Sequence, residues 1–346
     1  MSLPILLGLL ALVPLLSVPL TGFLGRAAGW PIGVIFLGLA GAMVPSAIRV
    51  ANGDVITWHA AWVPELGLDL ALRLDGLSVI FIALALVIGA LVFFYSTTYF
   101  TKGNQRGFYV IMTGFTFAMV ALTVSDSLVL MFLTWELTSL ASFLLIARSG
   151  HAGEAASLRT MLLTFIGGLA LLAAVALIMA RTGTSTFSQA IASPVWGSDP
   201  AFTGLIAVLV ALAGFSKAAQ FPFHLWLPDA MAAATPVSAY LHAAAVVKAG
   251  IYLLFRFSII FHSTLIWNVL LVGLGLFTSV LAAWFAMQQV DLKKLMAYST
   301  VSQLGLITAT IGVGTSFAIA AALLHTIAHA CFKSGLFMVV GLIDHQ

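Results

Sequence analysis

Six titratable side chains lie inside hydrophobic segments of this sequence. They are Glu136, Lys217, Lys248, His325, His329 and Lys333. A charged side chain at bilayer depth costs a few kcal/mol or more, so such residues persist mostly where they face a polar interior. Glutamate, lysine and histidine can each gain and lose a proton in such an interior. The six residues therefore predict a proton pathway through a membrane domain.

Glu136 and Lys217 are candidates for pairing. Glu136 lies within MFLTWELTSLASFLL, with apolar residues on both sides, so we expect it well inside the bilayer. A carboxyl group alone there would be protonated, whereas a nearby ammonium group would keep it ionised. We interpret the pair as a proton switch, because opening it would let the desolvated lysine release its proton. The alternative is a static ion pair that fixes helix packing.

His325, His329 and Lys333 follow at positions i, i+4 and i+8 of one apolar segment. This spacing places them on one stripe of one helix. Histidine titrates near physiological pH and can pass a proton through either ring nitrogen, so the stripe indicates proton conduction. One alternative is a histidine that only hydrogen-bonds a neighbouring backbone group. A metal site is disfavoured, because two histidines rarely complete a zinc shell, and we predict no metal and no cofactor.

Lys248 and His242 lie together in another apolar segment. Six positions separate them, about 240° around a continuous helix, so we do not expect them to share a face. We interpret Lys248 alone as a proton carrier. For His242 two roles stay open, a proton relay and a hydrogen bond to a backbone group freed by a nearby proline break.

The composition indicates that membrane helices position these residues. Of the 346 residues, 62% are hydrophobic and only 7% are charged, far fewer charged residues than in soluble domains. The chain is therefore predicted to be a polytopic membrane protein. Its formal net charge of +3 is too small to indicate a nucleic-acid partner. One cysteine excludes an intramolecular disulfide, and the sequence contains no glycine loop typical of ATP or NADH sites.

Eleven apolar runs are long enough to span the hydrocarbon core, which needs roughly 20 residues. They lie near residues 3–23, 30–49, 77–98, 108–125, 128–147, 159–180, 202–220, 235–260, 265–288, 293–313 and 315–340. The seventh run has an appended broken portion, 221–234, where Pro222 and Pro228 remove backbone donors. These prolines predict a second short helix or an irregular connection there.

Two connections are long enough to hold structure of their own. Residues 50–76 contain a leucine at every second position from Leu66 to Leu74, an alternation that predicts a small β-hairpin. Residues 182–200 are rich in Ser, Thr, Gly and Pro, and we predict a surface loop.

The distribution of basic residues in the loops predicts an orientation. With the N-terminus outside, the cytoplasmic loops hold Arg26, Lys102, Arg106, Arg148, Arg159, Lys293 and Lys294, and the outer loops hold Arg49, Arg73, Arg181 and Arg256. Seven against four favours this orientation, because basic residues retain loops in the cytoplasm. The hairpin is then expected outside.

Five stretches carry a family resemblance. They are DGLS before the third run, SDSLVLMFLTWELTSLASFLLI, FSKAAQFPFHLWLPDAMAAATPVSAYLHAAAVVKAGIYLL, LKKLMAYSTVSQLGLI and LLHTIAHACFKSGLFMVVGLIDH. Together they cover nearly the whole chain in order. The sequence resembles the antiporter-like subunits shared by Mrp-type cation/proton antiporters and respiratory complex I. VVKAG and the ending FMVVGLIDH look most like the large A-type Mrp subunit.

The resemblance implies roles for the matched residues. Glu136 matches the glutamate of the family's fifth helix, and Lys217 matches the lysine of its broken seventh helix, a pair that gates proton uptake. Lys248 matches the central carrier of the eighth helix. The stripe of His325, His329 and Lys333 matches the polar links toward a second half-channel.

The resemblance also implies an all-α fold with two inverted repeats of five helices, each with one broken helix. Residues 1–107 would be N-terminal helices with the external hairpin, 108–260 the first repeat and 261–346 the start of the second. Because the sequence stops after the eleventh run, we expect the second repeat to continue in a longer subunit or in another chain.

Two functions fit this pattern. The first is a secondary transporter, a subunit of a sodium/proton antiporter in the bacterial plasma membrane, with small hydrophobic subunits as partners and H+ and Na+ as transported ions. The second is a proton-pumping subunit of a complex I-like redox enzyme or membrane hydrogenase. A structural scaffold is disfavoured, because it would not need six titratable residues inside the membrane.

Overall fold

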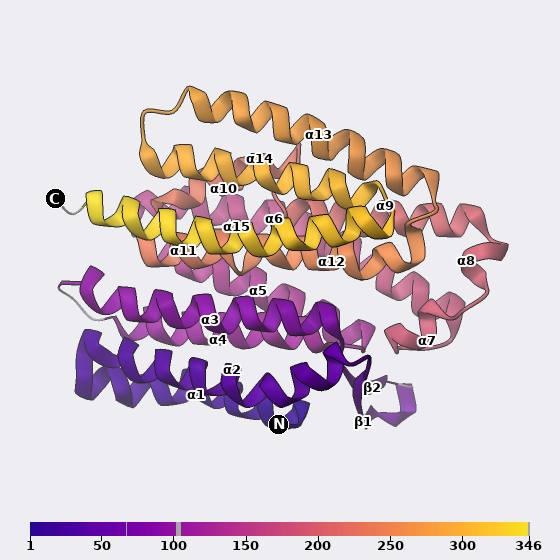
Figure 1. The fold of residues 1–346 in the computed structure, drawn as a ribbon, viewed down its shortest axis with the longest axis horizontal. Coiled ribbons are helices and arrows are strands. Elements are labelled where there is room, and N and C mark those ends of the chain that lie inside the picture. The colour runs from indigo at the N-terminus through magenta and orange to yellow at the C-terminus, as the bar shows by residue number, and fades with distance from the viewer. Residues whose placement is uncertain (67, 102–104, 345–346) are drawn as a thin grey trace.

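The structure, a computed structural model, describes residues 1–66, 68–101 and 105–344. Long helices run side by side along the long axis of the molecule, and a small β-hairpin lies at one end (Figure 1). We call this end the hairpin end; the C-terminus lies at the opposite end. Lys102, one of the predicted cytoplasmic cations, lies outside the described residues.

The first four long helices pack together on one side of the bundle (Figure 1). α1 (Leu3–Leu24) and α2 (Gly29–Ala51) are joined by a single 3-10 turn, η1 (Gly25–Ala28). α4 (Arg106–Val124) packs against α1, and α3 (Gly76–Tyr99) packs against α2. All four helices lie close to their predicted positions.

The hairpin predicted within residues 50–76 is confirmed. Strands β1 (Ile56–Val63) and β2 (Leu68–Leu74) pair antiparallel, and the short helix η2 (Pro64–Leu66) leads out of the first strand. Leu72 and Leu74 are buried against the bundle. The alternation of leucines therefore reflects a strand with one face on the protein core.

α5 (Leu128–Ala147) and α6 (His151–Thr182) form the next pair of contacting helices. The surface loop predicted over 182–200 is wrong. This segment contains two short helices at the hairpin end, α7 (Phe187–Ile191) and α8 (Val195–Ser198) (Figure 1). They form because apolar side chains on both are buried, a feature that the Ser, Thr, Gly and Pro content concealed.

The seventh predicted span is interrupted, as expected. α9 (Pro200–Lys217) is followed by three short pieces, η3 (Phe223–Leu225), α10 (Trp226–Asp229) and η4 (Ala230–Ala232). Ala219, just beyond α9, has a positive φ of 51°, which takes the chain out of the helical direction. The two prolines predicted to break this span lie in and beside the short pieces.

The eighth predicted span is two helices rather than one. α11 (Thr235–Ala243) and α12 (Val246–Phe261) are separated by Ala244 and Ala245. The φ and ψ angles of Ala245, −120° and −99°, are not helical. The sequence at the break is Ala-Ala-Ala-Val-Val, which contains neither proline nor glycine. The prediction of a continuous helix is therefore wrong, and the sequence held no local signal for the interruption.

Three long helices complete the described chain, α13 (Leu265–Met287), α14 (Leu292–Gly312) and α15 (Ser316–Ile343). α13 and α14 approach closely at two glycines. A Cβ atom on Gly275 would lie 2.7 Å from the Gly305 carbonyl oxygen. Small residues at such contacts are typical of helix pairs in membranes.

Within the described residues, nine helical segments are long and apolar enough to cross a membrane. The first of them, Leu3–Ala51, contains both α1 and α2, and α14 is not one of the nine. The chain is therefore a mostly helical, multi-pass membrane protein, and its described residues contain one small two-stranded sheet. The total of eleven spans stays a prediction.

Candidate functional site

Lys217 is the last residue of α9 and is fully buried. Its Nζ atom donates hydrogen bonds to the Trp135 carbonyl oxygen and to Thr138 Oγ1 (2.5 Å). The same atom lies 4.0 Å from the centre of the Trp135 ring. A carbonyl oxygen, a hydroxyl oxygen and an aromatic face all attract an ammonium group. α5 therefore provides a binding place for the charge of Lys217.

Glu136 lies next to Trp135 in the sequence, but its carboxyl group lies against α6. Glu136 is half-buried, and its Oε1 atom has no hydrogen-bond partner among the described residues. It lines an open groove of about 260 Å³ between α5 and α6. The other residues lining this groove are Leu133, Leu137, Ser139, Leu140, Met161 and Phe165. Because Lys217 bonds to Trp135 and Thr138, the structure does not show the direct ion pair, and the proton switch stays a prediction.

Gly168 on α6 makes room for the Glu136 carboxyl group. A methyl group at Gly168 would overlap Glu136 Oε1. The neighbouring Gly167 makes room in the same way for Ser216 on α9. The two glycines therefore let α6 pack closely against both helices of the predicted switch. Gly168 faces Glu136 on α5, and Gly167 faces the end of α9 next to Lys217.

Lys248 and His329 join α12 to α15 in the interior of the bundle. Lys248 Nζ lies 2.9 Å from His329 Nδ1, and both side chains are fully buried. An ammonium group can only donate, so in this state Nδ1 accepts and the ring proton resides on Nε2. His329 Nε2 has no hydrogen-bond partner in the described part of the chain. The ring can therefore take a proton at one nitrogen and release it at the other.

α15 carries the whole predicted stripe of two histidines and one lysine on one helix. Lys333 Nζ donates a hydrogen bond to Ser299 Oγ (2.5 Å). His325 Nε2 lies 2.8 Å from Gln303 Oε1. Ser299 and Gln303 both belong to α14. The stripe therefore runs along α14, and His329 in its middle turns to α12.

His242 lies near the end of α11 and is fully buried. Its ring packs near Trp226 and Phe337, with centroid distances of 6.3 Å and 5.7 Å. Neither ring nitrogen has a hydrogen-bond partner among the residues that the structure describes. The bond to a freed backbone group is thus not formed, and the relay role stays a prediction. The offset of 240° from Lys248 does not apply, because the helix is interrupted between the two residues.

Gly250 brings together the helices that carry the two buried lysines. A Cβ atom on Gly250 would lie 2.5 Å from the Ala218 backbone nitrogen and 2.7 Å from the Gly214 carbonyl oxygen. α12 and the end of α9 therefore touch backbone to backbone at this point. Lys217 precedes Ala218, and Lys248 lies two residues before Gly250.

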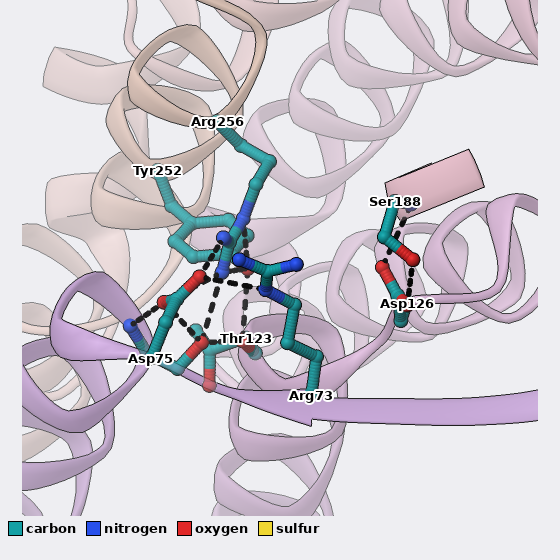
Figure 2. A network of polar contacts seen from close by, with 8 residues as sticks. Arg73, Asp75, Thr123, Asp126, Ser188, Tyr252 and Arg256 are labelled. Atoms are coloured by element: carbon teal, nitrogen blue, oxygen red, sulfur yellow. Dashed lines mark hydrogen bonds and ion pairs between the residues drawn. The ribbon is translucent and has the colours of Figure 1, made fainter. Parts of the chain in front are cut away.

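A separate charged cluster lies at the hairpin end (Figure 2). Arg256 on α12 is 4% exposed and pairs with both carboxylate oxygens of Asp75, the N-cap of α3. Arg256 Nη2 also donates to Ser78 Oγ (2.9 Å) and Tyr252 OH (2.7 Å). Arg73 Nε on β2 donates to Asp75 Oδ2 (3.2 Å). The prediction of Arg256 as an outer-loop cation is therefore wrong, because the residue is buried and paired within a helix.

The Asp75 carboxyl group is ionised at neutral pH, because its pKa lies below the ordinary value. Burial alone would raise its pKa, but the charge and hydrogen bonds of Arg256, the Ser78 N–H and the charge of Arg73 together lower it from 3.8 to about 2. A carboxyl group with a lowered pKa stabilises the folded state above its ordinary pKa. This contribution is therefore lost only as the pH falls from 3.8 toward 2.

Sequence reasoning missed the partners of the buried lysines and histidines. Thr138, Ser299 and Gln303 are uncharged polar residues with other hydroxyl residues next to them in the sequence. Ser and Thr in helices often bond to their own backbone, so nothing in the sequence singled these residues out as partners. Arg256 offered a stronger signal, since it lies eight residues after Lys248 in the same apolar run. That spacing puts both residues on one helix face.

Two protein families match the chain. Residues 125–346 match the family described as "NADH:quinone oxidoreductase/Mrp antiporter, TM". Residues 60–110 match the family described as "NADH-Ubiquinone oxidoreductase (complex I), chain 5 N-terminus". The first match covers more than half of the chain and contains all six titratable residues of the predicted pathway.

Curated relatives carry antiporter names. The chain is 41% identical over 336 residues to an A-type subunit of a Na(+)/H(+) antiporter from Alkalihalophilus pseudofirmus. This alignment covers 92% of this chain and 42% of the relative. The chain is 42% identical over 301 residues to the A/B-type subunit of a probable K(+)/H(+) antiporter from Rhizobium meliloti, covering 86% of this chain and 30% of the relative. The chain thus spans less than half the length of these relatives.

Two solved structures show the same fold. A chain of the Mrp complex from a Dietzia species has a TM-score of 0.96 and 50% identity, over 100% of this chain and 38% of that chain. A chain of the archaeal membrane-bound sulfane sulfur reductase, a respiratory membrane complex, has a TM-score of 0.82 and 26% identity, over 98% of this chain and 56% of that chain. The chain belongs to the NADH:quinone oxidoreductase/Mrp antiporter transmembrane family and is, within it, an antiporter-like chain of the A type.

Proposed function

We propose that the chain conducts protons as part of the large A-type component of a monovalent cation/proton antiporter built from several subunits, with Na+ as the exchanged cation. The identity of 41% to the A-type subunit of a Na(+)/H(+) antiporter supports this function. The identity of 50% to a chain of an Mrp complex supports a hetero-oligomeric assembly. The exchanged cation and the assembly are both inferred from relatives.

The observation that carries the proposal is the hydrogen bond between Lys248 and His329. Two titratable side chains from different helices meet there at 2.9 Å, fully buried within the bundle. Apolar packing does not require either residue, and placing them at bilayer depth costs free energy. Proton transfer between α12 and α15 at this point would explain why both Lys248 and His329 are buried in the bundle.

The proposed route begins at Lys217 and Glu136. When Lys217 leaves the oxygen atoms of α5, its ammonium group loses their stabilisation and can give up its proton. Lys248 first donates its own proton to His329 Nδ1 and, as a neutral amine, then receives the proton that Lys217 releases. His329 then releases a proton from Nε2 toward the other members of the stripe, His325 and Lys333.

Eleven membrane spans follow in this proposal when α1 and α2 are counted separately and α14 is added to the nine segments. Residues 1–107 are N-terminal helices with the hairpin, 108–260 form a first repeat with the broken α9 region, and 261–346 begin a second repeat. The α13 and α14 contact supports a span at α14, since α14 packs between α13 and α15.

The proposed location is the bacterial plasma membrane with the hairpin end outside. Because Arg256 is buried, it no longer counts among the four predicted outer-loop cations. Three outer cations then stand against seven cytoplasmic ones, a larger difference in favour of this orientation. Basic residues retain loops in the cytoplasm. Small hydrophobic subunits of the same complex are the proposed partners, together with the lipid bilayer.

The alternative is a proton-pumping subunit of a complex I-like redox enzyme. Its support is the match over residues 60–110 and the likeness to a chain of a respiratory complex. The identity in that comparison is 26%, against 50% for the chain of the Mrp complex. The antiporter is therefore the better supported of the two functions.

The proposed function is tested on the whole complex in energised everted vesicles. Adding sodium is expected to collapse the pH gradient, which acridine orange fluorescence reports, whereas choline should leave it unchanged. An assembled complex that leaves the gradient intact with sodium would contradict the proposal. Flavin and iron–sulfur polypeptides that copurify with the chain would support the redox alternative instead.

Gly168→Ala is expected to lower sodium-dependent proton movement between about tenfold and a hundredfold, because displacements of about 1 Å at a reacting group have effects of this size. The added methyl group displaces the flexible end of Glu136, so assembly should be intact. Alanine also favours a helix by about 1 kcal/mol over glycine. Gly273→Ala is the matched control, since a Cβ atom there meets nothing within 4 Å. Equal activity of the two variants would contradict the role of Gly168 in making room for the Glu136 carboxyl group.

A further inference from the structure

Arg256 occupies the hairpin end of a line of polar side chains on α12. Lys248, Tyr252 and Arg256 stand at i, i+4 and i+8 and so share one face of the helix. Eight residues of α-helix place about 12 Å between the first and the last of them. Lys248 is fully buried, whereas the side chains of Asp75 and Arg73 beside Arg256 are 17% and 31% exposed. The line therefore leads from the proposed proton carrier to the solvent side of the hairpin end.

The positive charge of Arg256 is permanent and held in one position. Its guanidinium group bonds to both oxygen atoms of Asp75, to Ser78 Oγ and to Tyr252 OH. Tyr252 OH and Ser78 Oγ each donate to the Thr123 carbonyl oxygen, at 2.8 Å and 2.7 Å. These bonds fix the cluster to α3 and α4 (Figure 2). A guanidinium group does not lose its proton in proteins.

The cluster also carries an excess of positive charge. Arg73 and Arg256 both contact Asp75, which gives two cations for one carboxylate. Asp126, another carboxylate near this cluster, accepts hydrogen bonds from Ser188 at 2.6 Å and 3.0 Å (Figure 2). The three side chains in contact, Arg73, Arg256 and Asp75, therefore present one net positive charge to a cation that moves along α12 toward them. The repulsion is stronger than in bulk water, because Arg256 is desolvated.

We propose that Arg256 is an electrostatic barrier that closes the hairpin end of α12 to protons and cations, so that a proton on Lys248 leaves through His329. The proposal rests on the proton-conducting function proposed above. A fixed arginine that excludes protons and cations from a pore acts by the same physics. Lys248 has two neighbouring routes, along α12 to Tyr252 and across to α15, and the barrier leaves the second one open.

The test measures passive proton flux without sodium. Liposomes contain the whole complex and trapped pyranine as the pH probe, and valinomycin with potassium prevents a membrane potential. Arg256→Gln is expected to speed the decay of an imposed pH difference about tenfold, the Coulomb factor for two unit charges about 12 Å apart at an effective dielectric constant of about 20. Arg181→Gln is the matched control. Arg181 pairs with Asp199 (3.1 Å) at the same end and is more than half exposed.

Two further variants separate charge from geometry. Arg256→Lys keeps the cation but loses the two-pronged pairing with Asp75, and Asp75→Asn breaks the ion pair but keeps the cation and an N-cap acceptor. Both complexes are expected to retain the low flux of the unmodified complex. A clamp that only holds helices together predicts a leak in all three variants. The proposal is overturned if either conservative variant leaks as Arg256→Gln does, or if Arg256→Gln itself stays tight.

A double variant protects the test against poor assembly. Arg256→Gln leaves the Asp75 carboxylate buried with a weaker partner, which destabilises the fold. Combining Arg256→Gln with Asp75→Asn removes that carboxylate and leaves Arg73 as one net positive charge, as in the unmodified cluster. This double variant is therefore expected to be as tight as the unmodified complex; a leak in it would overturn the barrier. Because this flux requires no sodium and no exchange, failure of the antiporter function would appear in the sodium assay alone.

Discussion

Lys248→Ala is expected to abolish sodium-dependent proton movement while the complex still assembles. The substitution removes the group that faces His329 Nδ1, so nothing on α12 can pass a proton to α15 at this point. Truncating a buried ammonium group also removes a charge that is costly at bilayer depth, so the fold should not lose stability for electrostatic reasons. The measurement is the fluorescence assay of the pH gradient, with the amount of assembled complex determined by size-exclusion chromatography.

Lys248→Arg separates proton transfer from static charge. A guanidinium group can replace the ammonium group as a hydrogen-bond donor to His329, but it does not release its proton at accessible pH. We therefore expect this variant to be as inactive as the alanine variant. Lys294→Ala is the control, because Lys294 is an exposed cation at the opposite end of α14 from the hairpin. Full exchange by Lys248→Arg would show that the lysine serves only as a fixed charge.

Lys217→Ala is also expected to abolish sodium/proton exchange completely. Lys217 is the only ammonium group that α5 holds with both a carbonyl and a hydroxyl oxygen in the described residues. Without it, the proposed route has no donor to begin proton transfer toward α12. Lys217→Arg should fail in the same assay, since it keeps the charge and cannot release a proton.

Glu136→Ala provides the companion to this experiment. Its carboxyl group is not paired with Lys217 in the structure, so its effect must come from the state in which Lys217 leaves α5. We expect loss of exchange with normal assembly, because removing a half-buried carboxyl group from an apolar groove does not disrupt packing. Normal exchange in either Glu136→Ala or Lys217→Ala would contradict the gating role of the pair.

Much of the helical frame could be predicted because apolar run length and prolines are local signals. The hairpin followed from leucines at alternate positions, and the broken α9 region followed from Pro222 and Pro228. The stripe on α15 followed from spacing alone, since i, i+4 and i+8 define one face of any α-helix. In each of these cases the decisive information lies within about ten consecutive residues.

The features that could not be predicted depend on contacts between distant segments. Ala244 and Ala245 are good helix formers by intrinsic propensity, so only tertiary packing explains the break between α11 and α12. Arg256 looked like a loop cation because its partner Asp75 lies 181 positions earlier in the chain. Whether Lys217 bonds to Glu136 or to the oxygen atoms of Trp135 and Thr138 likewise depends on the rotation of α5 and α9 about their own axes. Sequence periodicity does not determine how two helices are rotated relative to each other.

The backbone contact at Gly250 makes the two buried lysines parts of one mechanical unit. At Gly250 the backbone of α12 directly faces the Ala218 backbone nitrogen and the Gly214 carbonyl oxygen at the end of α9. Close-packed interiors transmit displacement instead of absorbing it. In the proposed route Lys217 leaves α5; if α9 shifts in that step, we expect α12 to shift or rotate with it and Lys248 to move relative to His329. Under this proposal, proton release at Lys217 would change the geometry at Lys248 before any proton has travelled between the two lysines.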